Sequence, residues 1–241
     1  MTGLLLIALG LLDWTFSYKE IAVFEDFLDN QLHSKTTELC RIMAECGSDK
    51  ATSHRSSHHN YTTFYHYLLK DFKNSFEKVF ELGLGTNNAN IPSNMSGGGT
   101  PCGSLRGWKG FFPNAHVYGA DIDRDILYQE DRISTYYCNQ LDPLSIASLW
   151  SNFDFKFNLI VEDGLHTFEA NKCFFENSSH MVAPGGFFII EDILNRRIPM
   201  YDSILQLARK SFSYAEIIII PNPSNPANNP DSDNTVLVAR K

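Results

Sequence analysis

Two acidic motifs in this chain each follow a run of apolar residues. The first is VEDGLH at Val161–His166, and the second is IIEDI at Ile189–Ile193. Each apolar run is typical of a buried strand, so the acidic side chains are expected to meet at one edge of a sheet. Carboxylates that lie this close repel one another unless a cation lies between them, and their oxygens suit Mg²⁺ or a similar divalent ion. The two motifs therefore predict a metal site.

The expected ligands of this site are Asp163, Glu191 and Asp192. Glu162 is left out because side chains alternate along a strand and should point it away from Asp163. His166 remains free for proton transfer, and its place shortly after Asp163 favours a general base over the alternative of a core or capping histidine.

A glycine-rich turn follows an earlier apolar run, in VFELGLGT at Val79–Thr86. Gly83 and Gly85 allow a tight turn and a close approach of the backbone to a ligand. The pattern E-x-G-x-G departs from the dinucleotide pattern G-x-G-x-x-G, so a pyrophosphate cradle is not expected. Glu81 at the strand end instead suits a ligand with a positively charged group.

Acidic and amide residues also follow the next two apolar runs. Asp121 ends the run within YGADID and is placed to accept both hydroxyls of a ribose, although capping of a helix by Asp121 or Asp123 is the alternative. After Cys138, either Gln140 or Asp142 could contact an adenine edge.

These motifs require a sheet whose strands are separated by helices. The expected strands are short apolar runs at Val79–Leu82, His116–Ala120, Thr135–Cys138, Phe157–Val161, Gly186–Ile190, Ala215–Ile220 and Thr235–Ala239. The expected helices between them are Gly103–Phe112, Pro143–Trp150, Phe168–Val182 and Met200–Ser211. Such alternation predicts an α/β fold with a mostly parallel, seven-stranded sheet and helices on both faces. The proline-rich stretch Pro221–Asp233 should be a loop or a hairpin tip between the last two strands.

Before this sheet, helical spacing predicts an N-terminal extension. Two helices are expected over Leu4–Met43, followed by a polar loop at Cys46–Asn60 and a helix with aromatic residues at Tyr61–Phe72. We expect residues 1–75 to form this helical extension and lid, and residues 76–241 to form the sheet domain. The apolar stretch Gly3–Leu12 is too short to span a bilayer, so a packing or oligomer helix is favoured over membrane targeting.

Composition narrows the function classes. The net charge is −8 and the 5 cysteines have no zinc-binding spacing. We therefore expect no nucleic-acid partner, a reducing cytoplasmic setting, no stable membrane insertion, and self-association through the apolar N-terminus.

The ordered set of motifs resembles the class I S-adenosylmethionine-dependent methyltransferases, with a Rossmann-like fold, over about Phe80 to Ile193. It is most similar to metal-dependent sugar O-methyltransferases of macrolide biosynthesis and to the related family called cephalosporin hydroxylases. Members of that group carry motifs like D-G-x-H, E-D, P-S-N-M…G-T-P…S-L-R-x-W and S-D-K…H-x-Y. In this chain the corresponding residues are Asp163–His166, Glu191–Asp192, Pro92–Met95, Gly99–Pro101, Ser104–Trp108, Ser48–Lys50 and His59–Tyr61.

The resemblance implies a role for each matching position. Glu81, Gly83, Gly85 and Thr86 would face the methionine end of S-adenosylmethionine, and Ser104 would bind its carboxylate. Asp121 would hold the ribose, with Gln140 or Asp142 beside the adenine. Asp163, Glu191 and Asp192 would bind Mg²⁺, and His166 would be the base. The adenine position is often Asp in the family, and here it is Gln140.

The expected function is Mg²⁺-dependent transfer of a methyl group from S-adenosylmethionine to a sugar hydroxyl. The sugar would belong to a glycan, a nucleotide-sugar or a glycosylated metabolite. A NAD-dependent Rossmann oxidoreductase and a non-catalytic cofactor-binding protein are the alternatives.

Overall fold

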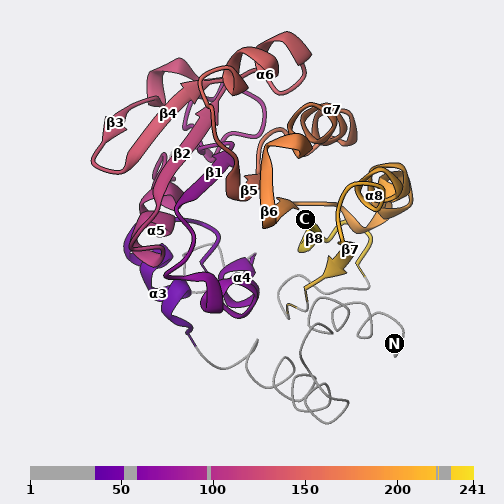
Figure 1. Ribbon diagram of the computed structural model, residues 1–241, viewed down its shortest axis with the longest axis horizontal. Helices are drawn as coiled ribbons and strands as arrows, with labels where there is room; N and C mark the ends of the chain where they lie inside the picture. Colours follow the sequence, from indigo (N-terminus) through magenta and orange to yellow (C-terminus); the bar gives the residue numbers. More distant parts are fainter. Residues whose placement is uncertain (1–35, 52–58, 97–98, 221, 223–228) are drawn as a thin grey trace.

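The computed structural model describes residues 36–51, 59–96, 99–220, 222 and 229–241 (Figure 1). The apolar stretch Gly3–Leu12 and most of the region expected to form the first two helices lie outside the described residues. Within the described part, the extension begins with helix α3 (Glu38–Glu45). The aromatic helix predicted at Tyr61–Phe72 is confirmed as α4 (Tyr61–Leu69) followed by the 3₁₀ helix η1 (Lys70–Phe72).

A single mixed sheet forms the centre of the described structure, in the order β3-β4-β2-β1-β5-β6-β8-β7. Its strands are β1 (Lys78–Leu82), β2 (His116–Asp121), β3 (Gln129–Glu130), β4 (Ile133–Tyr137), β5 (Phe157–Glu162), β6 (Val182–Ile190), β7 (Tyr214–Ile219) and β8 (Thr235–Arg240). The five strands β4, β2, β1, β5 and β6 run parallel. Antiparallel pairing of β7 with β8 confirms the predicted hairpin connection.

The sheet has one more strand than predicted. The additional strand β3 has two residues, both exposed, and pairs antiparallel with the start of β4. It was missed because its polar sequence carries no apolar run, and its pairing depends on a turn in which Arg132 adopts a φ of 56°. The expected number of seven strands was therefore wrong, whereas the fold class is confirmed.

Helices cover both faces of the sheet, as expected (Figure 1). On one face lie α3, α4 and α5 (Gly103–Phe111), and on the other lie α6 (Pro143–Trp150), α7 (Phe168–Ser178) and α8 (Asp202–Ala208). Polar N-caps start several of these helices. Thr37 Oγ1 accepts a hydrogen bond from Cys40 N at 3.1 Å, and Thr167 Oγ1 accepts one from Ala170 N at 3.3 Å.

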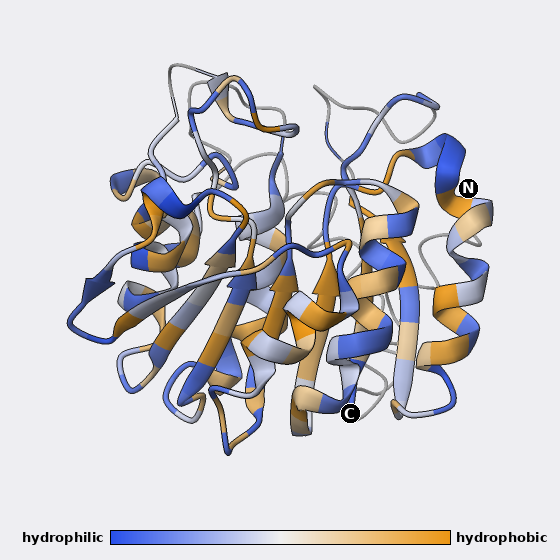
Figure 2. Cartoon of the chain, turned by 90° about the horizontal axis from the view of Figure 1, so that it is seen from above, coloured by the Kyte–Doolittle hydropathy of each residue, from blue (hydrophilic) through white to orange (hydrophobic). Residues whose placement is uncertain are grey.

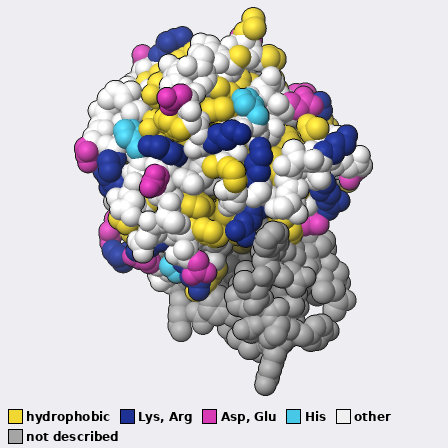
Figure 3. Space-filling view, in the orientation of Figure 1, with side chains coloured by type: hydrophobic (Ala, Val, Ile, Leu, Met, Phe, Trp, Pro, Cys, Tyr) yellow, Lys and Arg dark blue, Asp and Glu magenta, His cyan; other side chains and the backbone are white. Residues whose placement is uncertain are grey.

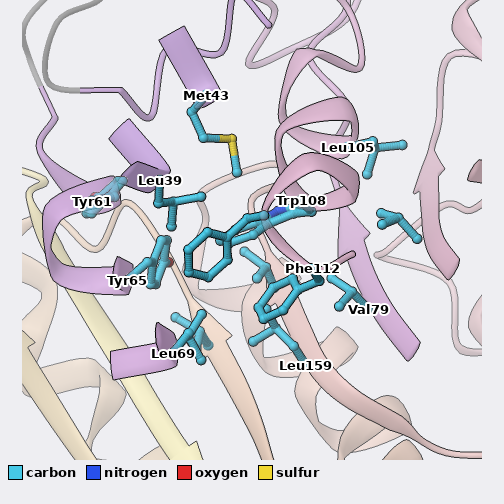
Figure 4. Close-up of a cluster of buried hydrophobic side chains, with 14 of the residues drawn as sticks. Leu39, Met43, Tyr61, Tyr65, Leu69, Val79, Leu105, Trp108, Phe112 and Leu159 are labelled. Atoms are coloured by element: carbon cyan, nitrogen blue, oxygen red, sulfur yellow. The ribbon is translucent and has the colours of Figure 1, made fainter. Parts of the chain in front are cut away.

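Apolar side chains project from both faces of the central strands and form one hydrophobic core on each face. In β1, Val79 belongs to the core under α3–α5, and its neighbour Phe80 belongs to the core under α6–α8. Figure 4 shows the first core, in which Trp108 of α5 lies among side chains of the sheet and of α4. The central strands are mostly hydrophobic in Figure 2, as expected for parallel strands covered on both faces.

The surface mixes charges of both signs. On the face shown in Figure 3, lysine and arginine side chains stand beside acidic and apolar ones, so the net negative charge does not come from a uniformly acidic exterior. No helix in the described ranges is both long enough and apolar enough to cross a bilayer.

The core under α6–α8 yields a stability prediction. Phe157 of β5 is 0% exposed, and its ring contacts five aromatic rings, including Trp150 and Phe80. Phe157→Ala should lower the free energy of unfolding by about 3–5 kcal/mol, because it removes apolar contacts and leaves a cavity. Chemical denaturation would measure the loss. Leu144→Ala, at an 80% exposed position, is the control and should change stability by less than about 0.5 kcal/mol. Equal effects of the two substitutions would contradict this core.

Candidate functional site

A cavity of about 460 Å³ lies at the carboxyl ends of β1, β2, β4, β5 and β6. It is at the position where chain order reverses between β1 and β5, which is where open parallel sheets bind their ligands. All but one of the predicted site residues line it: Glu81, Gly83, Gly85, Thr86, Ser104, Asp121, Gln140, Asp163, His166, Glu191 and Asp192. The exception is Asp142, whose side chain caps α6.

The glycine turn after β1 packs against the residues that follow β5 at the edge of the cavity. Gly83 has a φ of +86°, and a Cβ added there would lie 2.0 Å from the carbonyl oxygen of Asp163. Asp163 N in turn donates to Leu82 O at 2.9 Å. Only glycine permits both the left-handed backbone and this approach, so the turn fixes Asp163 relative to β1.

Asp121 organises the turn after β1 from the neighbouring strand. Its Oδ2 accepts a hydrogen bond from Leu84 N at 2.7 Å, and its Oδ1 accepts one from Asp123 N at 2.8 Å. Burial raises the pKa of this carboxyl, while the backbone donors lower it. Asp123 caps the 3₁₀ helix Arg124–Ile126 and accepts from the hydroxyl of Thr86. Capping therefore falls to Asp123, and Asp121 faces the cavity.

Glu81 lies at the bottom of the cavity and is fully buried. Its Oε1 accepts a hydrogen bond from Ser104 Oγ at 2.6 Å, and its Oε2 accepts one from the indole of Trp108. Burial raises its pKa, opposed by the positive charge of Lys50. The two donors from α5 thus fix the direction of the Glu81 carboxylate.

Gln140, which follows β4, forms hydrogen bonds with the acidic motif at the end of β5. Its Oε1 accepts from Leu165 N at 2.8 Å, and its Nε2 donates to Glu162 Oε1 at 2.9 Å. A Cβ at Gly164 would lie 1.9 Å from Gln140 Oε1, so Gly164 is required for this contact. Glu162 does not line the cavity, as the strand alternation predicted, and burial raises its pKa to about 7.

Asp163, His166 and Asp192 come together as a group that could hold a metal ion. One ligand atom from each lies within 4.8 Å of the others. His166 Nε2 is 3.6 Å from Asp192 Oδ2 and 3.9 Å from Asp163 Oδ1. This set fits a divalent cation, because carboxylate oxygens and an imidazole nitrogen are ligands that such ions accept.

His166 and Asp192 both adopt a left-handed backbone, with φ of 55° for each. Such a conformation is uncommon for non-glycine residues and is found where the surrounding structure holds it in place. Here the guanidinium of Arg197 donates to His166 O at 3.2 Å, and the hydroxyl of Tyr61 donates to Asp192 Oδ1 at 2.6 Å. The conformation aims both side chains at the same point of the cavity.

Glu191 lies next to this group but has other partners. It is 1% exposed, with Oε2 accepting from Lys50 Nζ at 2.6 Å and Oε1 accepting from Tyr65 OH at 2.6 Å. The structure therefore brings two of the three predicted ligands, Asp163 and Asp192, together with His166. The third, Glu191, is hydrogen-bonded to the ammonium of Lys50 and the phenol of Tyr65 instead.

Three side chains of the extension reach the acidic cluster, a contact that the sequence analysis did not predict. Lys50, Tyr61 and Tyr65 contact Asp163, Glu191 and Asp192 from the segment around α4. The resemblance had marked the S-D-K and H-x-Y segments, but nothing in the sequence indicated which carboxylates they would reach. The spacing of Tyr61 and Tyr65 on one helix face was the available signal.

His59 also lines the cavity, stacked on Tyr61 with 4.9 Å between ring centroids. Its Nδ1 lies 3.8 Å from Asp192 Oδ1, on the side opposite His166. The sequence analysis had not assigned it a role. His54 and His58 lie outside the described residues.

The ionisation of the cluster follows from burial and charge. Burial raises the pKa of Asp192 and of Glu191, and the nearby positive charges only partly oppose this. For His166, burial would lower the pKa, but the carboxylates of Asp192 and Asp163 outweigh it and raise the pKa. The same balance, with Asp163 and Glu191 as partners, raises the pKa of Lys50. The acidic cluster therefore favours the protonated forms of His166 and Lys50.

The adenine position gives a testable difference between Gln140 and Asp142. Asp142 Oδ1 accepts from Leu144 N at 3.0 Å as the N-cap of α6. Asp142→Ala should cost about 0.5–2 kcal/mol of stability and leave the affinity for S-adenosylhomocysteine unchanged. Denaturation and calorimetry would measure the two effects. Gln140→Ala is the comparison and should weaken ligand binding, because the Gly164–Leu165 turn loses its support. A large loss of affinity in Asp142→Ala alone would reverse the assignment.

The chain is similar in sequence to sugar O-methyltransferases. No protein-family model matches it. Over 56% of this chain it is 32% identical to demethylmacrocin O-methyltransferase of Streptomyces fradiae, of which 32% is covered. Over 63% of this chain it is 31% identical to mycinamicin VI 2''-O-methyltransferase of Micromonospora griseorubida, of which 38% is covered. The match thus spans about a third of the length of these relatives.

Solved structures with the same fold are methyltransferases. MycE methyltransferase from the mycinamycin biosynthetic pathway, in complex with Mg and SAH, matches with a TM-score of 0.63 at 21% identity, over 86% of this chain and 55% of that one. A ribosomal RNA methyltransferase, putative, from Plasmodium falciparum matches with a TM-score of 0.53 at 12% identity, over 76% of this chain and 94% of that one. The chain is therefore similar in sequence, over part of its length, to these O-methyltransferases and has the fold of the methyltransferases among the solved structures.

Proposed function

We propose that this chain is a Mg²⁺-dependent O-methyltransferase that moves a methyl group from S-adenosylmethionine to a hydroxyl of a sugar. One observation carries the proposal: the carboxylate and imidazole group of Asp163, His166 and Asp192 opens into the same cavity as Glu81 and Asp121. A donor subsite and an acceptor subsite thus adjoin, as methyl transfer requires. The sugar is inferred from the relatives, whose names describe methylation of sugars on macrolides and tetracenomycins.

The cofactor half of the cavity fits S-adenosylmethionine by the chemistry of its side chains. Glu81 supplies a fixed negative charge for the ammonium of the methionine end. Asp121 lies at the end of the next strand, where a carboxylate can accept from ribose hydroxyls. Gly85, with a φ of +71°, keeps the loop backbone close to this space. The exposed apolar side chains Ile122 and Leu141 also line the cavity and suit the faces of an adenine ring.

The acceptor half must place a hydroxyl oxygen in line with the sulfonium methyl and remove its proton. The hydroxyl oxygen would attack the methyl carbon and release the sulfur as a thioether, and Nε2 of a neutral His166 would accept the hydroxyl proton. A bound Mg²⁺ would supply the charge that lowers the pKa of a sugar hydroxyl. Asp163 and Asp192 would hold this ion, and Glu191 lies next to them. Arg197 holds the backbone of His166 in position through a hydrogen bond to its carbonyl oxygen.

A binding and turnover experiment tests the proposal as a whole. Calorimetry should detect S-adenosylhomocysteine binding and no NADH binding, since the chain lacks a pyrophosphate cradle. Turnover of S-adenosylmethionine to S-adenosylhomocysteine should then appear with one member of a panel of glycosides, nucleotide-sugars and oligosaccharides. Tight NADH binding alone would favour the oxidoreductase. Cofactor binding without turnover on any acceptor would favour the non-catalytic protein.

His166→Ala should lower the methyl-transfer rate by about 10²–10⁴-fold, because the acceptor proton loses its base. The affinity for S-adenosylhomocysteine should not change, since His166 lies on the acceptor side. Single-turnover kinetics would measure the rate. His180→Ala, outside the cavity, is the matched control. A rate in His166→Ala equal to that of this control would assign the base to another group.

Asp192→Asn should weaken Mg²⁺ binding by about tenfold or more, because it replaces a ligand carboxylate with a neutral amide of the same shape. Calorimetric titration with MgCl₂ would show the change, and EDTA should abolish turnover of the unmodified chain. Asp202→Asn, an exposed position paired with Gln206, should leave Mg²⁺ binding unchanged. Turnover that survives both EDTA and Asp192→Asn would disprove the metal dependence.

A further inference from the structure

A single buried lysine stands between the two halves of the cavity. Lys50 is 2% exposed, and its Nζ lies 2.6 Å from Glu191 Oε2 and 3.7 Å from Glu81 Oε1. The same ammonium also donates to Asp163 Oδ2. Three carboxylates from three different strand ends therefore share one positive charge, and two of them belong to the expected metal-binding set.

The backbone around Lys50 is fixed by contacts with two helices. Lys50 O accepts from Thr62 N at 3.3 Å at the start of α4, and Lys50 N donates to Ser48 Oγ at 3.3 Å. A Cβ at Gly103, the first residue of α5, would lie 2.8 Å from Cys46 O, so this segment packs closely on that helix. The ammonium thus enters the acidic cluster from a firmly held segment.

The position of Lys50 conflicts in part with that of a divalent ion. Asp163 Oδ1 and Asp192 Oδ2 face His166, whereas Asp163 Oδ2 and Glu191 Oε2 face Lys50. An ion held by Asp163, Asp192 and Glu191 would lie beside the ammonium and compete with it for the same carboxylates. Two like charges this close, shielded from water, repel strongly.

We infer that Lys50 is a positioning residue that serves as a built-in counter-cation: it holds Asp163, Glu191 and Glu81 together before a divalent ion binds, and it weakens the binding of that ion by sharing Asp163 and Glu191 with it. This inference rests on the proposed function, which supplies the divalent ion. The ion then replaces the contacts of Lys50 with Asp163 and Glu191, and the ammonium keeps Glu81 as its partner. Metal affinity is thereby set by the extension as well as by the motifs of the sheet.

Lys50→Met tests the inference, because methionine is an unbranched side chain of similar length that carries no charge. The metal-free variant should unfold at a lower temperature than the unmodified chain, since removal of one partner leaves buried carboxylates uncompensated. Its affinity for Mg²⁺ should rise by about tenfold or more, because the competing charge is gone. Thermal denaturation and calorimetric titration with MgCl₂, without cofactor or acceptor, would measure both changes.

Lys73→Met is the matched control. Lys73 Nζ pairs with Glu38 Oε1 at 2.7 Å on the surface, so its loss should not change Mg²⁺ affinity. Lys50→Arg retains the charge and should not bind Mg²⁺ more tightly than the unmodified chain. Unchanged or weaker Mg²⁺ binding by Lys50→Met would overturn the role of Lys50. Failure of the unmodified chain to bind Mg²⁺ would instead count against the proposed function.

A measurement on the unmodified chain covers the case in which Lys50→Met does not fold. The side-chain ammonium of Lys50, held by carboxylates and shielded from water, should give its own resonance in ¹⁵N-lysine spectra. Lys50→Arg would identify this resonance by its absence. Addition of MgCl₂ should shift it as the contacts with Asp163 and Glu191 change, and a resonance that stays in place while Mg²⁺ binds would disprove the exchange.

Discussion

The burial of several carboxylates at one edge of a sheet is the constraint on which this site depends. Glu81, Asp163, Glu191 and Asp192 follow or end three neighbouring strands, and their mutual repulsion must be offset by donors or cations. The chain supplies these from outside the sheet: Lys50, Tyr61 and Tyr65 come from the extension, and Ser104 and Trp108 come from α5. The extension is thus part of the site as well as a cover over one face.

The same constraint explains the backbone of the site. Gly83 allows the turn after β1 to touch the carbonyl of Asp163, and Gly164 allows the amide of Gln140 to hold the turn after β5. His166 and Asp192 adopt left-handed conformations that local sequence alone does not favour. Hydrogen bonds from Arg197 to His166 and from Tyr61 to Asp192 stabilise these conformations. Residues outside the cluster therefore maintain its geometry.

Two subsites in one cavity connect this geometry with the relatives. The cofactor half uses the turn after β1 and the end of β2, a position that belongs to the fold. The acidic half lies at the ends of β5 and β6, where the sequence carries the D-G-x-H and E-D motifs that resemble those of metal-dependent sugar O-methyltransferases. The matches cover 32% and 38% of those relatives, and the sugar acceptor belongs to the proposed function.

The sequence by itself determined the order of most strands and helices along the chain, the edge of the sheet that carries the site, and most of the lining residues that follow the strands, because apolar runs and the polar residues after them are local patterns. It did not determine β3, which has no apolar run and depends on pairing with β4. It also left open whether Gln140 or Asp142 faces the cavity, since both follow the same strand. Only the tertiary structure placed Lys50 on Glu191, a contact that spans the sheet and the extension. Such a contact has no local signal, because it depends on how α4 and α5 pack against β1 and bring a distant segment to the acidic edge of the sheet.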